Sequence, residues 1–131
     1  RISGPLMDRF DLRIEVPPVA YRDLELASGG ETSAAVAARV TAARERQASR
    51  FGTPLRLNAD LEGAALEDHA RPDDEGRDLL NRAAERFGLS ARGYHRALRV
   101  ARTIADLAGE ARVRRPHVAE AVSFRLAGAA V

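Results

Sequence analysis

Apolar side chains recur at every third or fourth position along most of this chain, a spacing that places them on one face of an α-helix. They are mainly alanine, leucine and valine, and aromatic residues make up only 5% of the chain. The most regular repeat lies in residues 90–109, where a wheel of about 100° per residue gathers on one side Tyr94, Ala97, Leu98, Ala101, Ile104, Ala105 and Ala108. The spacing predicts a mainly α-helical fold.

Local start and stop signals divide the rest of the chain into helices. Thr32 or Ser33 is the expected N-cap of a long helix that ends at Phe51, with Gly52 just beyond it. Further helices are predicted over residues 60–69, 73–87, 90–107 and from Pro116 onward. Four to five helices with short connections make a small helical bundle.

The N-terminal segment departs from the helical pattern. Phe10, Leu12, Ile14 and Val16 alternate with charged residues, which is the period of a half-buried β-strand, and the proline pair at residues 17–18 ends the run. We therefore expect one β-strand to precede the bundle.

Arg9 stands at the entrance to this expected strand, where a stiff backbone could aim its guanidinium group. Asp8 and Asp11 lie close to it in sequence. A salt bridge from either carboxylate would make Arg9 a structural residue of the strand entrance, and this alternative stays open at the level of sequence.

Residues 28–33, Ser-Gly-Gly-Glu-Thr-Ser, are typical of a linker that leads into a helix start. They divide the chain into residues 1–27, with the strand, and residues 28–131, with the helices. A length of 131 residues suits one compact domain with a shorter attached segment.

All 21 basic residues are arginine, so these residues cannot contain the lysine of a phosphate-binding P-loop. The net charge is only +2, which gives no general argument for nucleic acid. Cysteine is absent, which excludes disulfides and thiolate metal sites and suits a cytoplasmic protein. No apolar run approaches the roughly 18 residues of a membrane span, so we expect no membrane partner.

Two helices carry rows of arginine. On the helix from Ser90 the row opposite the apolar face is Arg92, Arg96 and Arg99. On the helix of residues 33–51 it is Arg39, Arg46 and Arg50. The first row could bind an anion, and Arg92 lies in the first helical turn, where free N–H groups favour phosphate. The second could follow a DNA backbone, but no aromatic residue accompanies it to contact bases. A solvated surface is the alternative for both rows.

No metal site is expected. The three histidines, His69, His95 and His117, are far apart in sequence and lack paired ligand spacing. The acidic run at residues 73–75 is better explained by the positive end of a helix dipole than by a bound cation.

Three stretches of the chain resemble one family. Residues 1–19, RISGPLMDRFDLRIEVPPV, are similar to the arginine-finger segment of the magnesium-chelatase-like AAA+ ATPases of the ComM/YifB type. LSARGYHRALRVARTIADLAG resembles the lid helix of the same ATPases, and the stretch ARERQASRFG with the later LNADL is similar to the same family. The two end motifs, in this order and separation, make the resemblance specific over essentially the whole chain.

The resemblance implies an AAA+ lid preceded by the last strand of the ATPase core, as the C-terminal part of a larger ATPase. Arg9 then matches the arginine finger, which acts on the nucleotide of a neighbouring subunit. Arg92 matches the sensor-2 arginine, and Arg96 or Arg99 on the same face could take that role instead.

The implied cofactors are ATP and Mg²⁺, bound by the parent protein and not by this piece alone. The implied partners are the N-terminal P-loop core of the same chain and neighbouring subunits of a homo-oligomeric ring, expected to be a hexamer, with DNA as a further candidate. A free-standing helical adaptor or DNA-binding module with arginine-rich faces is the alternative.

Overall fold

The computed structural model describes residues 3–25 and 29–126, and within them it is mainly helical. The elements in chain order are α1 (Gly4–Met7), α2 (Tyr21–Leu24), α3 (Ser33–Phe51), the 3₁₀ turn η1 (Asn58–Asp60), α4 (Gly63–Ala70), α5 (Asp74–Phe87), α6 (Ala91–Leu107) and α7 (Arg115–Leu126). The prediction of a small helical bundle is confirmed.

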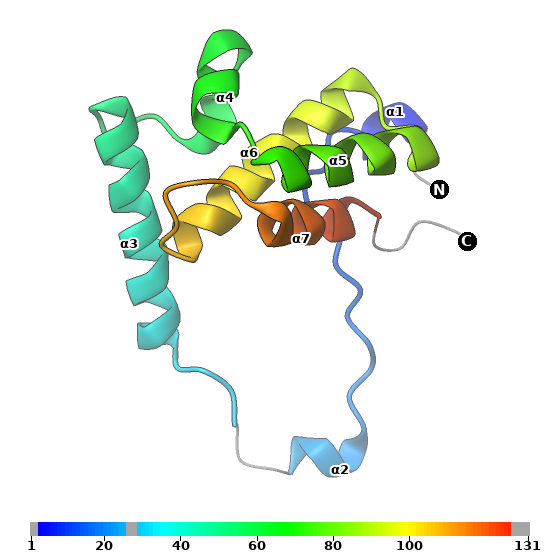
Figure 1. Ribbon diagram of the computed structural model, residues 1–131. Coiled ribbons are helices and arrows are strands. Elements are labelled where there is room, and N and C mark those ends of the chain that lie inside the picture. Colours follow the sequence, from blue (N-terminus) through cyan, green and yellow to red (C-terminus); the bar gives the residue numbers. More distant parts are fainter. Residues whose placement is uncertain (1–2, 26–28, 127–131) are drawn as a thin grey trace.

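Helix α6 is the centre of the bundle. It packs against α7, α3 and α4, and α5 packs against α7 (Figure 1). Most of the predicted apolar face of α6 is buried, but Ala108 is exposed, and Arg102 and Asp106 are buried as well. The core consists of Leu61, Leu66, Ala70, Leu80, Ala83, Ala97, Leu98, Ala101, Ala105, Val113, Val118, Ala121 and Val122.

The predicted helix ends are largely confirmed, because local hydrogen bonds set them. The side-chain oxygen of Thr32 accepts from the N–H of Ala35 at 3.1 Å, and that of Ser90 accepts from the N–H of Gly93 at 3.0 Å. Gly52 follows α3 in the left-handed region, with φ of 70°.

The starts of α4 to α7 differ from the predicted residues by one to three positions. The helix expected from residue 60 begins at Gly63, because residues 58–60 form the separate turn η1. The last helix begins at Arg115, one residue before Pro116.

The expected β-strand over residues 10–16 is absent from the described residues. The segment is extended but has no partner strand, and Val16 is 86% exposed. The only β-type pairing in the parts of the chain that the structure describes is an isolated bridge between Pro72 and Val113. A strand needs a neighbour for its N–H and C=O groups, and here the N–H of Arg13 instead donates to the carbonyl of Phe124 at 2.9 Å.

The two ends of the N-terminal segment differ in their contacts with the bundle. Residues 8–13 hydrogen-bond to α6 and α7, whereas α2 lies well apart from the helices (Figure 1). The predicted boundary between residues 27 and 28 lies outside the described residues.

Helix α3 extends beyond the bundle at its N-terminal end (Figure 1). Its C-terminal half packs on α6 through buried Ala43 and Gln47. Val36 and Val40, nearer the start of the helix, are exposed. The apolar side chains of α3 are therefore covered only in its C-terminal half.

Candidate functional site

Arg9 lies just after α1 and its side chain is exposed. Among the described residues, its guanidinium group makes no salt bridge, because both neighbouring carboxylates are paired elsewhere. Asp8 pairs with Arg125 at 3.3 Å, and Asp11 pairs with Arg96 at 2.8 Å. The alternative in which Asp8 or Asp11 holds Arg9 is therefore not the arrangement observed.

Two guanidinium groups from the bundle bind the backbone around Arg9. Arg96 Nη1 donates to the carbonyl oxygen of Arg9 at 2.9 Å as well as to Asp11 Oδ1. Arg125 Nη1 donates to the carbonyl of Phe10 at 3.1 Å, and its Nη2 donates to the carbonyl of Asp8 and to Asp8 Oδ1, both at 3.3 Å. We call Arg96 and Arg125 the arginine clamp.

The deeper member of the clamp is Arg125, whose side chain is only 4% exposed. It crosses the first turn of α6 at Gly93, where an added Cβ would lie 2.9 Å from Arg125 Nε and Nη2. Burial lowers the pKa of Arg125, and the carboxylate of Asp8 opposes this shift. The Ser90 hydroxyl, which caps α6, also donates to Asp8 Oδ2 at 3.2 Å.

The three arginines predicted to share one face of α6 have different surroundings. Arg92, the second residue of α6, is exposed. Arg96 belongs to the clamp. Arg99 is half-buried, and its Nε donates to the carbonyl of Leu61 at 2.7 Å. Of the three, Arg92 is the one whose guanidinium group is open to an external anion.

A groove of about 620 Å³ lies beside the clamp, along α6. Asp11, Arg96 and Arg99 contribute charge to its wall, and the apolar part includes Val100 and Ile104 of α6. The exposed N-terminal segment adds Leu12. The groove is thus formed jointly by the bundle and the segment that carries Arg9.

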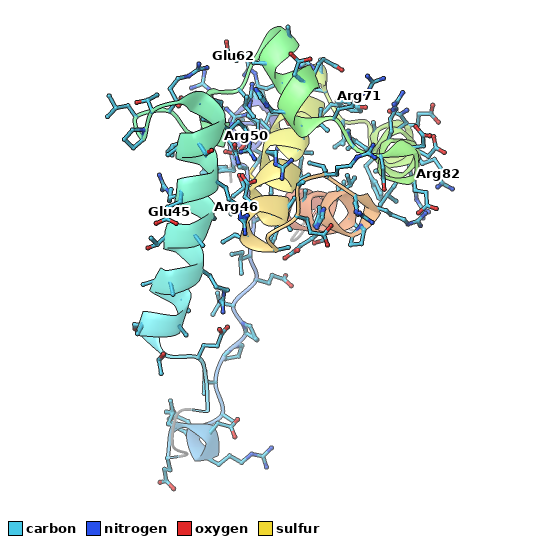
Figure 2. All side chains as sticks on the ribbon, turned by 60° about the vertical axis from the view of Figure 1, so that its left-hand side comes forward. Glu45, Arg46, Arg50, Glu62, Arg71 and Arg82 are labelled. Atoms are coloured by element: carbon cyan, nitrogen blue, oxygen red, sulfur yellow. The ribbon has the colours of Figure 1, made fainter. Side chains whose placement is uncertain are left out.

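The three arginines of the row predicted on α3 have different surroundings, and only Arg50 is turned into the bundle. Arg50 points toward α6 (Figure 2), where its Nη2 and Nη1 donate to Asp106 Oδ1 at 2.7 Å and Oδ2 at 2.9 Å. Arg46 also points toward α6 (Figure 2), but it is exposed. Arg39 pairs with Glu31. The interpretation of Arg50 as a solvent-facing or DNA-facing residue is wrong.

Arg50 belongs to a buried polar cluster that sequence reasoning missed. Asp106, at its centre, also accepts from Asn58 Nδ2 at 2.8 Å and pairs with Arg102 at 3.0 Å. Arg102 is buried and donates to the carbonyls of Glu110 and Ala111. The i,i+4 spacing of Arg102 and Asp106 was the available signal, although nothing local indicated that the pair would be buried.

The environment of Asp106 has opposing effects on its pKa. Burial alone would raise it, but the hydrogen bonds from Arg50 and Asn58, with the positive charges of Arg102 and Arg50, more than offset burial, so the pKa lies below the usual range. Asp106 is therefore a carboxylate that the fold holds ionised.

His117 and Asp73 each make a hydrogen bond with a nearby backbone N–H. His117 is buried, and its Nδ1 accepts from the N–H of Arg114 at 2.9 Å beside the start of α7. Asp73 caps α5 through the N–H of Gly76 at 2.8 Å. Within residues 3–25 and 29–126, no three His, Cys, Asp or Glu side chains gather closely enough to hold a metal ion.

Comparison with known proteins places this geometry in a family. Residues 30–125 match the family described as magnesium chelatase, subunit ChlI C-terminal. The chain belongs to this family. The match covers α3 to α7 almost completely, including both members of the clamp and the polar cluster around Asp106.

Several relatives of this magnesium chelatase C-terminal domain extend the similarity. The chain is 44% identical to competence protein ComM of Haemophilus influenzae, 43% to YifB of Salmonella typhimurium and 41% to YifB of Escherichia coli. Each alignment covers 95% of this chain and 24% of the relative, so the chain spans about a quarter of the length of these proteins. Coverage of 95% requires that the alignments extend into the segment before α3.

No helix in the described parts of the chain is both long and apolar enough to cross a membrane.

Proposed function

We propose that this chain supplies the arginine finger and the sensor-2 lid of a magnesium-chelatase-like AAA+ ATPase that works as a ring. The observation that carries the proposal is the environment of Arg9. Its side chain is exposed, the neighbouring carboxylates are paired with the clamp, and the backbone on both sides is held against the bundle.

Arg9 in this proposal contacts the γ-phosphate of ATP bound by the neighbouring subunit. A guanidinium group is permanently charged and offers paired donors to phosphate oxygens, so it stabilises the charge of the transferring phosphoryl group without a proton transfer. Exposure suits a group that acts across a subunit boundary, because the surface that it must reach belongs to another molecule.

Arg92 is the residue that we assign to the nucleotide of its own subunit. It combines an exposed guanidinium group with a place in the first turn of α6, where the helix dipole also favours anions. Arg96, the other candidate for this role, has its donors directed to Asp11 and the carbonyl of Arg9. We therefore prefer Arg92 for the nucleotide contact.

ATP and Mg²⁺ fit the donor chemistry of Arg9 and Arg92 only in part. Both residues suit phosphate oxygens, but the chain has no lysine and hence no P-loop to hold the phosphates or the metal ion. The nucleotide would supply the phosphoryl group, and the core of the parent protein would hold it. We place this motor in the cytoplasm and propose DNA as its substrate class, as the resemblance to ATPases of the ComM/YifB type implies.

The alternative of a free-standing adaptor or DNA-binding module has weaker support. Its basic surface was the row on α3, and there Arg50 is turned inward to Asp106 while Arg39 is paired with Glu31. Binding of DNA by arginines depends on phosphate contacts that these pairs would have to give up.

The test is ATP turnover by the parent protein carrying Arg9→Ala. An arginine finger contributes roughly 10³ to 10⁵ in rate, or about 4 to 7 kcal/mol of barrier. We expect a loss in this range, and recovery when the variant is mixed with subunits whose own nucleotide site is disabled but whose Arg9 is intact. Arg22→Ala, an exposed arginine of α2 on the same segment, is the matched control and should leave turnover unchanged. Normal turnover by Arg9→Ala would refute the finger assignment.

A further inference from the structure

We propose that Arg96 and Arg125 are positioning residues that present Arg9 to the neighbouring subunit. The inference rests on the proposed function of Arg9. Its basis is that two arginines from different helices of the bundle converge on four consecutive residues of an otherwise exposed segment, residues 8–11.

The clamp binds the backbone as well as side chains. The carbonyl oxygens of Asp8, Arg9 and Phe10 all accept hydrogen bonds from Arg96 or Arg125. Consecutive carbonyls bound from fixed helices restrict the path of the chain through Arg9, whereas a side-chain salt bridge alone would leave the backbone free to rotate. An irregular segment thereby gains the rigidity that a β-strand would have given it.

The architecture around Arg125 is specific for this contact. A buried guanidinium group loses hydration and needs hydrogen-bond partners in compensation, and Arg125 finds them in Asp8 and Phe10. The side chain reaches them over Gly93, where any side chain would collide with it. An arginine with only a surface role would require neither burial nor the glycine.

The clamp also keeps two carboxylates away from Arg9. Asp8 is paired with Arg125 and Asp11 with Arg96, so neither is available to Arg9. If the clamp arginines were removed, both carboxylates would become free to pair with the adjacent guanidinium group and compete with phosphate for it. Positioning and electrostatic separation therefore act in the same direction.

The experiment uses the full-length parent protein with Arg96→Gln and, separately, Arg125→Gln. We expect the turnover number to fall by up to about 100-fold, the size of effect produced by small misplacement of a catalytic group, while KM for ATP changes little. Mixing either variant with subunits that have a disabled nucleotide site and intact Arg9 should restore turnover, as for Arg9→Ala. Arg96→Lys, which keeps a charged donor, should lose less than Arg96→Gln.

A merely structural role predicts a different result. A damaged lid would impair the nucleotide site of the variant subunit itself, so KM would rise and mixing would not restore turnover. That outcome would overturn the proposal. Arg114→Gln, which breaks an exposed pair with Glu110 at 3.2 Å, is the matched control and should behave as wild type.

Gly93→Ala provides an independent test if Arg125→Gln fails to fold. The added methyl group forces the Arg125 guanidinium group to shift but keeps its charge, and should lower turnover, by less than Arg125→Gln does, with recovery on mixing. If Arg9→Ala is inactive but the clamp variants and Gly93→Ala turn over normally, the clamp proposal fails while the finger proposal stands. If Arg9→Ala itself is fully active, the proposed function fails first.

Discussion

Replacing Asp106 with asparagine should destabilise the fold more than almost any other conservative change in this chain. The Asp106 side chain is 1% exposed, and it balances Arg102 and Arg50, whose side chains are 4% and 13% exposed. Asparagine has nearly the same size, so packing is preserved. What changes is that two buried positive charges lose their shared counter-charge, and an amide N–H₂ group is turned toward arginine donors.

The expected magnitude follows from the class of interaction. Removing one partner of a buried ion pair typically costs about 3 to 5 kcal/mol, because the remaining charge stays buried without compensation. A domain of this size has a total stability of roughly 5 to 15 kcal/mol. With a urea m-value of about 2 kcal/mol/M, the loss would move the unfolding midpoint by about 2 M.

The assay is urea unfolding of the chain at neutral pH, followed by far-ultraviolet circular dichroism. Asp78→Asn is the matched control, because Asp78 is exposed on α5 and substitution there should change stability by no more than about 0.5 kcal/mol. If Asp106→Asn costs no more than this control, the buried cluster contributes nothing to stability and the reasoning is refuted.

The stability of the wild-type chain and of Asp106→Asn, measured as a function of pH in acid, gives a second test of Asp106. The pKa of Asp106 is depressed in the folded state, so around and below the ordinary aspartate pKa of about 3.9 the unfolded chain binds the proton more readily than the folded one. Stability from this group is thus fully present above that pH and is lost as pH falls toward the folded pKa. Asp106→Asn lacks the group and should show a shallower loss of stability in acid.

Two further predictions concern single residues. Arg92→Ala in the parent protein should raise KM for ATP by at least about 10-fold, the effect of losing one charged hydrogen bond. Arg82→Ala, at an exposed position of α5, is the control and should leave KM unchanged. Equal KM values for the two variants in steady-state assays would argue against Arg92 as the nucleotide contact. Gly88→Ala should lower the free energy of unfolding by about 1 kcal/mol in urea, because Gly88 has φ of 62°. No atom lies near the position of an added Cβ, so the substitution tests backbone strain alone. An unchanged unfolding midpoint would show that α5 can end without a left-handed residue.

The parts of the fold that were predictable from sequence are those set by local interactions. Thr32 and Ser90 cap their helices through residues three positions later, and Gly52 ends α3 through its own backbone angle. The apolar part of the buried face of α6 also follows from spacing, whereas the burial of Arg102 and Asp106 does not. Each of these features depends on neighbours within one or two helical turns, which a sequence displays directly.

The strand failed as a prediction for a related reason. Alternation shows that the segment containing Ile14 and Val16 suits a pleated, half-buried environment, but a strand forms only where another strand accepts its hydrogen bonds. The described residues contain no such partner. The pattern therefore identifies a segment prepared for a sheet, and the exposure of its apolar side chains is the physical consequence.

The candidate site was predictable in composition but not in contacts. Arg9, Arg92 and Arg96 could be selected from sequence, yet the partner of Arg96 lies 85 residues away at Asp11, and no periodicity links the two. A helical wheel gives the direction of a side chain from its own axis. It cannot show that an irregular segment will fold over that face.

Burial divides the arginines of this lysine-free chain into two groups with different chemistry. Arg102 and Arg125 are buried, and each directs its flat, forked group to several acceptors at once, including backbone carbonyls, which the compact ammonium group of lysine matches poorly. Arg9 and Arg92 are exposed and have donors to spare. An arginine row in such a sequence is therefore weak evidence for nucleic acid, because the same residue type also builds the interior. The exposed arginines fixed next to buried ones are the better candidates for phosphate, since the fold has already satisfied the carboxylates that would otherwise compete for them.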